Sequence, residues 1–163
     1  MSYDLHLILK SEGDPAEAYE RLDEREPTPD EERDIRQLVA DLQAVDPDLD
    51  VNGSGAGKGF WLQMGYENER PVVIDIDGVT LTMSWSYGAD DPAPALAAVE
   101  QCLPVFDRHG YVAYDPQLER VYQPARDRLE AEQVHRDVQA RVFESLERSG
   151  DEASWWRRLL ARR

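Results

Sequence analysis

Alternation of apolar and polar side chains predicts β-strands in several short segments of the chain. Apolar residues occupy every second position from Tyr3 to Leu9, and again from Phe60 to Tyr66. A period of two is expected where one face of a strand is buried. Residues 111–114 (Tyr-Val-Ala-Tyr) indicate a further short strand, and residues 121–122 a possible return strand.

The segment 71–86 predicts a β-hairpin. Asp77-Gly78 has the composition of a two-residue turn. If Ile76 pairs with Val79, one register places apolar side chains on one face and polar ones on the other. The facing pairs are then Ile74–Leu81 and Val72–Met83 on the apolar side, and Asp75–Thr80 and Val73–Thr82 on the polar side.

Helical spacing and start signals predict four helices. Asp14-Pro15 begins one that should run to about Arg25, with Asp14 as its N-cap and Glu17 at the capping-box position. Thr28-Pro29 begins the second, which Asp46-Pro47-Asp48 should end. Its expected buried stripe is Ile35, Leu38, Val39, Leu42 and Val45.

The last two helices are expected after residue 91 and after residue 124. Asp91-Pro92 begins one with Leu96, Val99, Leu103 and Phe106 on its inner side; Pro104 is expected to kink it or end it early. Pro124 begins a long helix that should reach about Arg148. Its imperfect apolar stripe contains Leu129, Val134, Val138, Val142, Phe143 and Leu146.

These elements together predict the fold class and the domains. We expect an α+β fold with a single antiparallel or mixed sheet of about five strands, helices packed on one face and a long C-terminal helix. Residues 1–150 form one domain, and residues 151–163 a basic amphipathic tail containing Trp155-Trp156. We expect that tail to dock onto the acidic body; a membrane surface or a partner protein are the alternatives.

Charge changes the picture of what the protein can bind. The net charge is −16, and the first 50 residues hold 16 acidic and 5 basic residues. Such a field repels nucleic acids and anionic membranes, and it attracts a basic protein. Because Cys102 is the single cysteine and the start of the chain has no signal-peptide pattern, we expect a cytoplasmic protein.

Sequence motifs for catalysis, metals or cofactors are absent. The glycine-rich run 53–59 includes Gly57-Lys58 but lacks the spacing and the following Ser or Thr of a phosphate-binding loop. His6, His109 and His135 share no ligand spacing. We therefore expect a protein that is not an enzyme and has no cofactor and no metal.

Two sets of residues remain candidates for a site. Asp75 and Asp77 project from one strand face and could form an acid–base or ligand site together with His6. Trp61 points away from Phe60 and Leu62 and could lie on an open sheet face as an apolar anchor for a partner. The partner-binding candidates are Trp61, Tyr66, Asp75, Glu31 and Asp34, since the acidic region from Glu12 to Asp50 supplies the charge.

Two stretches resemble a group of small bacterial proteins. The opening Ser2-Tyr3-Asp4-Leu5 and the segment 110–117 (Gly-Tyr-Val-Ala-Tyr-Asp-Pro-Gln) resemble proteins with a Tyr-Asp-Leu start and a Tyr-Asp-Pro-Gln segment. Some members of this group resemble immunity proteins of polymorphic toxin systems. The resemblance covers about a dozen positions and implies no catalytic residues.

The resulting hypothesis is a non-enzymatic acidic binding protein, an immunity protein or antitoxin that blocks one basic toxin through surface complementarity. One alternative is an enzyme or small-ligand-binding protein with a site around Asp75, Asp77 and His6. Another is a structural subunit of a larger assembly that uses the long last helix.

Overall fold

The computed structural model describes the chain except residues 1, 23–24, 54–58, 66–70, 88–90 and 149–163. In chain order, its elements are β1 (Ser2–Leu9), η1 (Lys10–Glu12), α1 (Pro15–Glu20), α2 (Pro29–Val45), β2 (Val51–Gly53), β3 (Trp61–Met64), β4 (Val73–Asp77), β5 (Thr80–Ser86), α3 (Ala93–Arg108), β6 (Tyr111–Asp115), β7 (Arg120–Val121) and α4 (Pro124–Arg148). The fold is α+β with one antiparallel sheet, as the sequence predicted.

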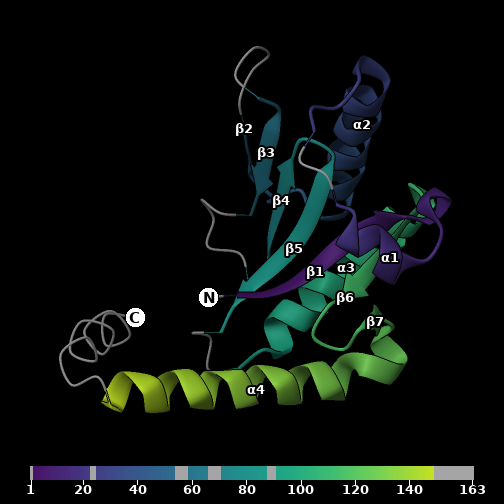
Figure 1. Ribbon diagram of the computed structural model, residues 1–163. Helices are drawn as coiled ribbons and strands as arrows, with labels where there is room; N and C mark the ends of the chain where they lie inside the picture. Colours follow the sequence, from purple (N-terminus) through teal and green to yellow (C-terminus); the bar gives the residue numbers. More distant parts are fainter. Residues whose placement is uncertain (1, 23–24, 54–58, 66–70, 88–90, 149–163) are drawn as a thin grey trace.

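The strands form a seven-stranded sheet in the order β2-β3-β4-β5-β1-β6-β7. Every neighbouring pair is antiparallel. The strands β2 to β5 follow one another as a meander, and β1 lies between β5 and β6 (Figure 1). The sheet therefore joins the first strand of the chain to elements more than 70 residues away.

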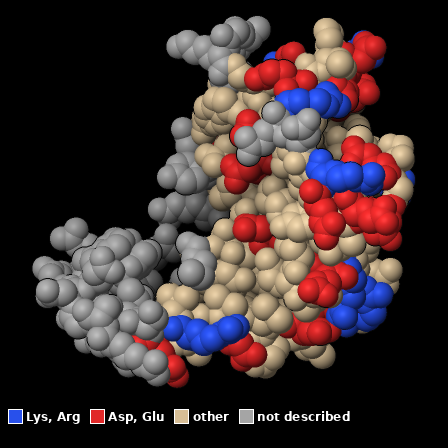
Figure 2. Space-filling model, in the orientation of Figure 1, with Lys and Arg blue, Asp and Glu red and all other residues tan. Residues whose placement is uncertain are grey.

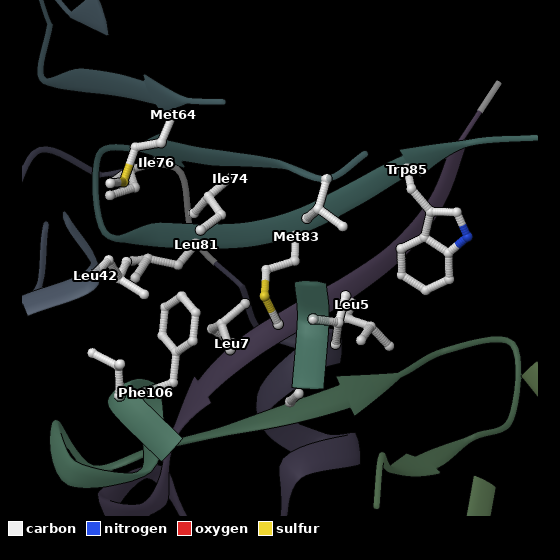
Figure 3. Packing of buried hydrophobic residues seen from close by; sticks show 14 of the residues in the cluster. Leu5, Leu7, Leu42, Met64, Ile74, Ile76, Leu81, Met83, Trp85 and Phe106 are labelled. Carbon is white, nitrogen blue, oxygen red and sulfur yellow. The ribbon is translucent and has the colours of Figure 1, made fainter. Parts of the chain in front are cut away.

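The main core lies between the sheet and the helices α2 and α3. Leu38 and Leu42 of α2 and Phe106 of α3 are almost fully buried against alternate residues of the strands. Figure 3 shows this packing around Leu7, Leu81 and Met83. Burial of apolar area is the main stabilising contribution to folding. The contact with α2 and α3 therefore determines which side of the sheet faces the core.

Start signals of the helices are largely confirmed. The Asp14 side chain accepts hydrogen bonds from the backbone N–H groups of Ala16 and Glu17. Thr28 and Glu31 form a capping box at the start of α2, with each side chain bonded to the other residue's backbone N–H. The helix α1 ends at Glu20, however, and not near Arg25.

The prediction that helices cover one face is wrong for α1. Ile8, Ala18 and Tyr114 form a second buried cluster on the opposite side of the sheet, with α1 packed over β1 and β6 (Figure 1). Helix α1 packs on this side because Ile8 is apolar, whereas Asp4 and His6 on the same side of β1 are polar. Ile8 therefore gives α1 an apolar contact.

The long helix α4 packs along the core side of the molecule through an unexpected set of residues. Among the side chains of α4 that the structure describes, Asp127, Ala131 and His135 are fully buried, and they are spaced four apart. The ring of His135 stacks on Tyr87 with 5.1 Å between the centroids. Leu129, predicted to be buried, is 79% exposed, and Val45 of α2 is also exposed.

Two further sequence predictions need correction. The sheet has seven strands rather than about five, because Val51–Gly53 pairs with β3 and Arg120–Val121 pairs with β6. The hairpin register is shifted by two residues: Asp77 pairs with Thr80, and Ile76 with Leu81. The loop is Gly78-Val79, which puts glycine at the first central position, as a type II′ turn prefers.

Because the shift is two residues, every side chain of the hairpin keeps its predicted face. Pro104 lies inside α3 without ending it, and Leu103 is only partly buried. None of the described helices is long and apolar enough to cross a membrane.

Candidate protein-binding face

One side of the sheet is lined by polar side chains, and we call it the polar sheet face. It consists of the side chains of β1 to β5 that point away from α2 and α3. Its residues are Asp4, His6, Asn52, Trp61, Gln63, Val73, Asp75, Asp77, Thr80, Thr82, Ser84 and Ser86. Their neighbours along each strand are the buried core residues, so strand alternation alone positions this face.

The charge of the polar sheet face is negative. The strands β1 to β5 contain no Lys or Arg, whereas Asp4, Asp75 and Asp77 all point to this side. Figure 2 shows this side, with separate carboxylates among uncharged atoms over the strands and the basic groups toward the margins, next to acidic ones. The face therefore presents carboxylates without neutralising cations on its own strands.

Basic side chains elsewhere are engaged in local ion pairs. Each of the following pairs has an N–O distance of 4.0 Å or less: Lys10–Asp107, Arg25–Glu31, Arg36–Glu32, Arg120–Asp127, Arg128–Glu100 and Arg136–Glu132. Because these cations are paired with nearby carboxylates, they do not neutralise carboxylates on other surfaces. The polar sheet face is one of the surfaces that keep their negative charge.

Trp61 and Asp77 face each other across β3 and β4. The backbone N–H of Gly78 donates to the Phe60 carbonyl at 2.8 Å, so Phe60 and Gly78 form a hydrogen-bonded pair of the two strands. The adjacent Trp61–Asp77 pair is then of the non-hydrogen-bonded type, in which side chains lie closest, with Cβ atoms about 4.5–5.5 Å apart. Trp61 is 42% exposed, one of three large apolar residues so exposed in the described part of the chain.

Gln63 and Asp75 form the next close pair on the same two strands. The Gln63 amide Nε2 donates to Asp75 Oδ1 at 2.6 Å. This bond fixes the direction of the Asp75 carboxylate and occupies one of its two oxygens. The other oxygen, Oδ2, remains available to accept from a partner.

His6 lies in the same cross-strand row, beyond Thr82. Its Nδ1 is 3.4 Å from the Thr82 hydroxyl, and its ring contacts Tyr19 with 4.8 Å between centroids. Burial lowers the pKa of His6, against a smaller opposing effect of Asp4. At neutral pH the imidazole is therefore neutral, and the face keeps its negative charge.

The other two candidates, Glu31 and Asp34, lie on α2, which packs against the core side of the sheet. Glu31 is part of the capping box and pairs with Arg25, and these bonds lower its pKa to about 2. Asp34 is highly exposed, 3.9 Å from Arg33. Since α2 packs on the core side, these two residues do not belong to the polar sheet face, although Glu31 pairs with Arg25, whose carbonyl oxygen lies beside Gly78. Tyr66 lies outside the described residues.

Asp75, Asp77 and His6 share the polar sheet face without converging. Thr82 separates His6 from Asp75 by two strand spacings, about 10 Å. Among the residues that the structure describes, no group of three His, Cys, Asp or Glu side chains could hold a metal ion. A cavity of about 260 Å³ lies elsewhere, between α2, β4 and α3, and is lined by Leu49, Val72, Ala98 and Cys102 among others.

A buried polar network lies at the end of the sheet near α4. Asp115 is fully buried, and its carboxylate accepts from the Tyr3 hydroxyl at 2.6 Å and from the backbone N–H groups of Gln117 and Leu118. Burial raises the pKa of Asp115 more than these bonds lower it. This network joins the Tyr-Asp-Leu start to the Tyr-Asp-Pro-Gln segment, so these residues hold the fold together.

Sequence reasoning missed this network and the buried Asp127. Asp127 accepts from Arg126 Nε at 2.7 Å and from the Gln123 backbone N–H at 2.8 Å, which satisfies it inside the protein. The spacing of Asp127, Ala131 and His135 on one helix face was the available signal. Polar residues at two of the three positions concealed it.

Comparison of the chain with protein-family models, with curated proteins and with solved structures found no match. The site must therefore be interpreted from its own geometry.

Proposed function

We propose that this protein is a non-enzymatic acidic binding protein, an immunity protein or antitoxin that blocks a basic toxin. The polar sheet face is the surface we assign to the toxin. The observation that carries the proposal is the exposed Trp61 beside Asp77 and Asp75, on strands without a basic side chain.

Electrostatic complementarity supports a basic partner. A surface that combines an aromatic anchor with carboxylates provides buried apolar contact at its centre and charge for specificity. A toxin that acts on nucleic acids needs a basic cleft, and an acidic surface occupying that cleft excludes the substrate without chemistry. The resemblance of the Tyr3 and Asp115 segments to immunity-like proteins points in the same direction.

The test is binding to the toxin candidate encoded beside this gene. We expect the purified full chain to capture that protein at low salt, to lose affinity as salt rises, and to protect cells that express it. Failure to bind any basic protein from a neighbouring gene, and failure to protect, would contradict the proposal.

Charge reversal locates the surface. Asp75→Lys should weaken binding, whereas Asp34→Lys makes the same charge change on exposed α2 and should leave binding nearly unchanged. If Asp34→Lys alone weakens binding, the toxin binds α2 and our choice of the polar sheet face is wrong.

A second candidate function is an enzyme or small-ligand site around His6, Asp75 and Asp77. The observation that favours it is that His6 and Asp75 both pair with Thr82, one on each side, and so lie in one cross-strand row on the same face. Such a function requires His6→Asn to abolish an activity or a ligand contact. The binding function requires the His6→Asn protein still to neutralise its partner.

A further inference from the structure

We propose that the Trp61–Asp77 pair, with Asp75, forms a subsite for an arginine side chain of the partner. This inference rests on the proposed function and deepens it, because it names the group that the polar sheet face recognises. The indole of Trp61 would lie against the guanidinium, while the two carboxylates accept its N–H groups.

Trp61 and Asp77 form a close cross-strand pair between β3 and β4. In this non-hydrogen-bonded pair the indole and the carboxylate leave the sheet side by side. Within the described residues, no hydrogen bond or ion pair involves the Asp77 side chain. Its carboxylate is exposed, and it lies next to the Trp61 side chain, which is 42% exposed.

Asp75 provides the second carboxylate. It lies two residues before Asp77 on the same face of β4, so the Cα atoms of the two residues are about 7 Å apart along the strand. Gln63 holds Asp75 Oδ1 at 2.6 Å, leaving Oδ2 for a second donor. A cation resting on Trp61 would thus have one carboxylate directly beside it and a second on the diagonal.

The arrangement favours arginine over lysine. A guanidinium is planar, stacks on aromatic rings and donates to carboxylates in two directions at once. An ammonium is compact and strongly hydrated, and it cannot both cover the indole and reach two carboxylates. The flat open arrangement of Trp61, Asp77 and Asp75 therefore fits arginine better.

The probe is a blocked hexaarginine peptide, titrated into the full-length protein at low salt and followed by NMR. We expect the indole N–H of Trp61 and the backbone amides of β3 and β4 to shift first. Hexalysine, with the same charge, should bind more weakly and shift the Trp61 indole less.

The variants separate the subsite from general acidity. Trp61→Ala and Asp77→Asn should each weaken hexaarginine binding about threefold, the size expected of one exposed cation–π or ion-pair contact. Asp34→Asn removes the same charge from α2 and should change affinity much less. Circular dichroism checks that all three variants are folded.

Each outcome decides the inference. Equal binding of hexaarginine and hexalysine, or no loss in Trp61→Ala and Asp77→Asn, overturns the arginine subsite. Binding of the toxin candidate can persist in those cases, and then the proposed function stands while the subsite falls. If the toxin candidate does not bind but hexaarginine binds selectively at Trp61, the subsite stands and the immunity function falls.

Discussion

Gly78 adopts a backbone conformation that a side chain would strain. Its φ is +58°, and a Cβ there would lie 2.2 Å from the carbonyl oxygen of Arg25. The backbone of Arg25, between α1 and α2, thus lies directly against the turn between β4 and β5. This close approach fixes the turn next to Asp77.

Gly78→Ala should destabilise the protein by about 2 kcal/mol or more, since it adds a steric clash to the cost of positive φ. Gly110→Ala is the matched control, because Gly110 also has positive φ (+83°) but has open space around its Cβ position. It should cost about 1 kcal/mol. Urea unfolding measures both, and equal losses would show that the Arg25 contact relaxes freely.

The Tyr3 hydroxyl is the second residue-scale feature with a measurable effect. Tyr3→Phe removes the donor to buried Asp115 and should lower the free energy of unfolding by about 1–3 kcal/mol, because the carboxylate loses a partner. Tyr19→Phe is the control, since no hydrogen bond of the Tyr19 hydroxyl is found within the described residues. A similar small loss in both variants would contradict a role for the Tyr3–Asp115 bond.

At the scale of elements, Asp127 anchors the start of α4. Bonds from Arg126 and from the Gln123 backbone lower the pKa of Asp127 to about 2. A carboxyl with a pKa lowered by folding stabilises the folded state above its ordinary pKa near 4, and this contribution is lost as the pH falls toward 2.

Asp127→Asn should therefore destabilise the protein at pH 7 by about 2 kcal/mol, the order expected of hydrogen bonds to a buried charge. The loss of stability between pH 4 and pH 2 should also become shallower than in the wild type. Chemical denaturation across this pH range provides the measurement. An unchanged pH profile would mean that Asp127 is not ionised in the folded protein.

The elements themselves were predictable to different degrees. The helix start at Thr28-Pro29 and the N-cap of Asp14 are local signals, and both predictions are confirmed. The strand Val51–Gly53 was not, because its three residues carry a loop-like composition and are ordered by pairing with β3. Glycine is suited to position 53 because any Cβ there would lie only 2.4 Å from the Leu62 side chain, which is too close.

At the scale of the whole molecule, the net charge of −16 opposes folding through self-repulsion. Added salt screens this repulsion, so the melting temperature should rise between about 20 and 300 mM NaCl. Affinity for a basic partner should fall over the same range. A melting temperature that falls with salt would show that the local ion pairs outweigh the repulsion.

The candidate site could be predicted only in part. Alternation in the sequence correctly placed Trp61, Asp75 and Asp77 on the side of the strands away from the core. It could not show that Trp61 is directly opposite Asp77, because the register of β3 against β4 depends on how these two strands pair in the folded sheet. Nor could it show that α2, which carries Glu31 and Asp34, packs on the core side of the sheet.

The sequence alone determined the α+β class, the helix starts and the face of each strand residue, because these follow from local periodicity and capping within a few residues. Tertiary structure decided the strand order, the packing of α1 on the second face and the burial of Asp115 and Asp127. These depend on contacts between distant segments, such as Tyr3 with Asp115, whose free energy exists only once the chain has folded.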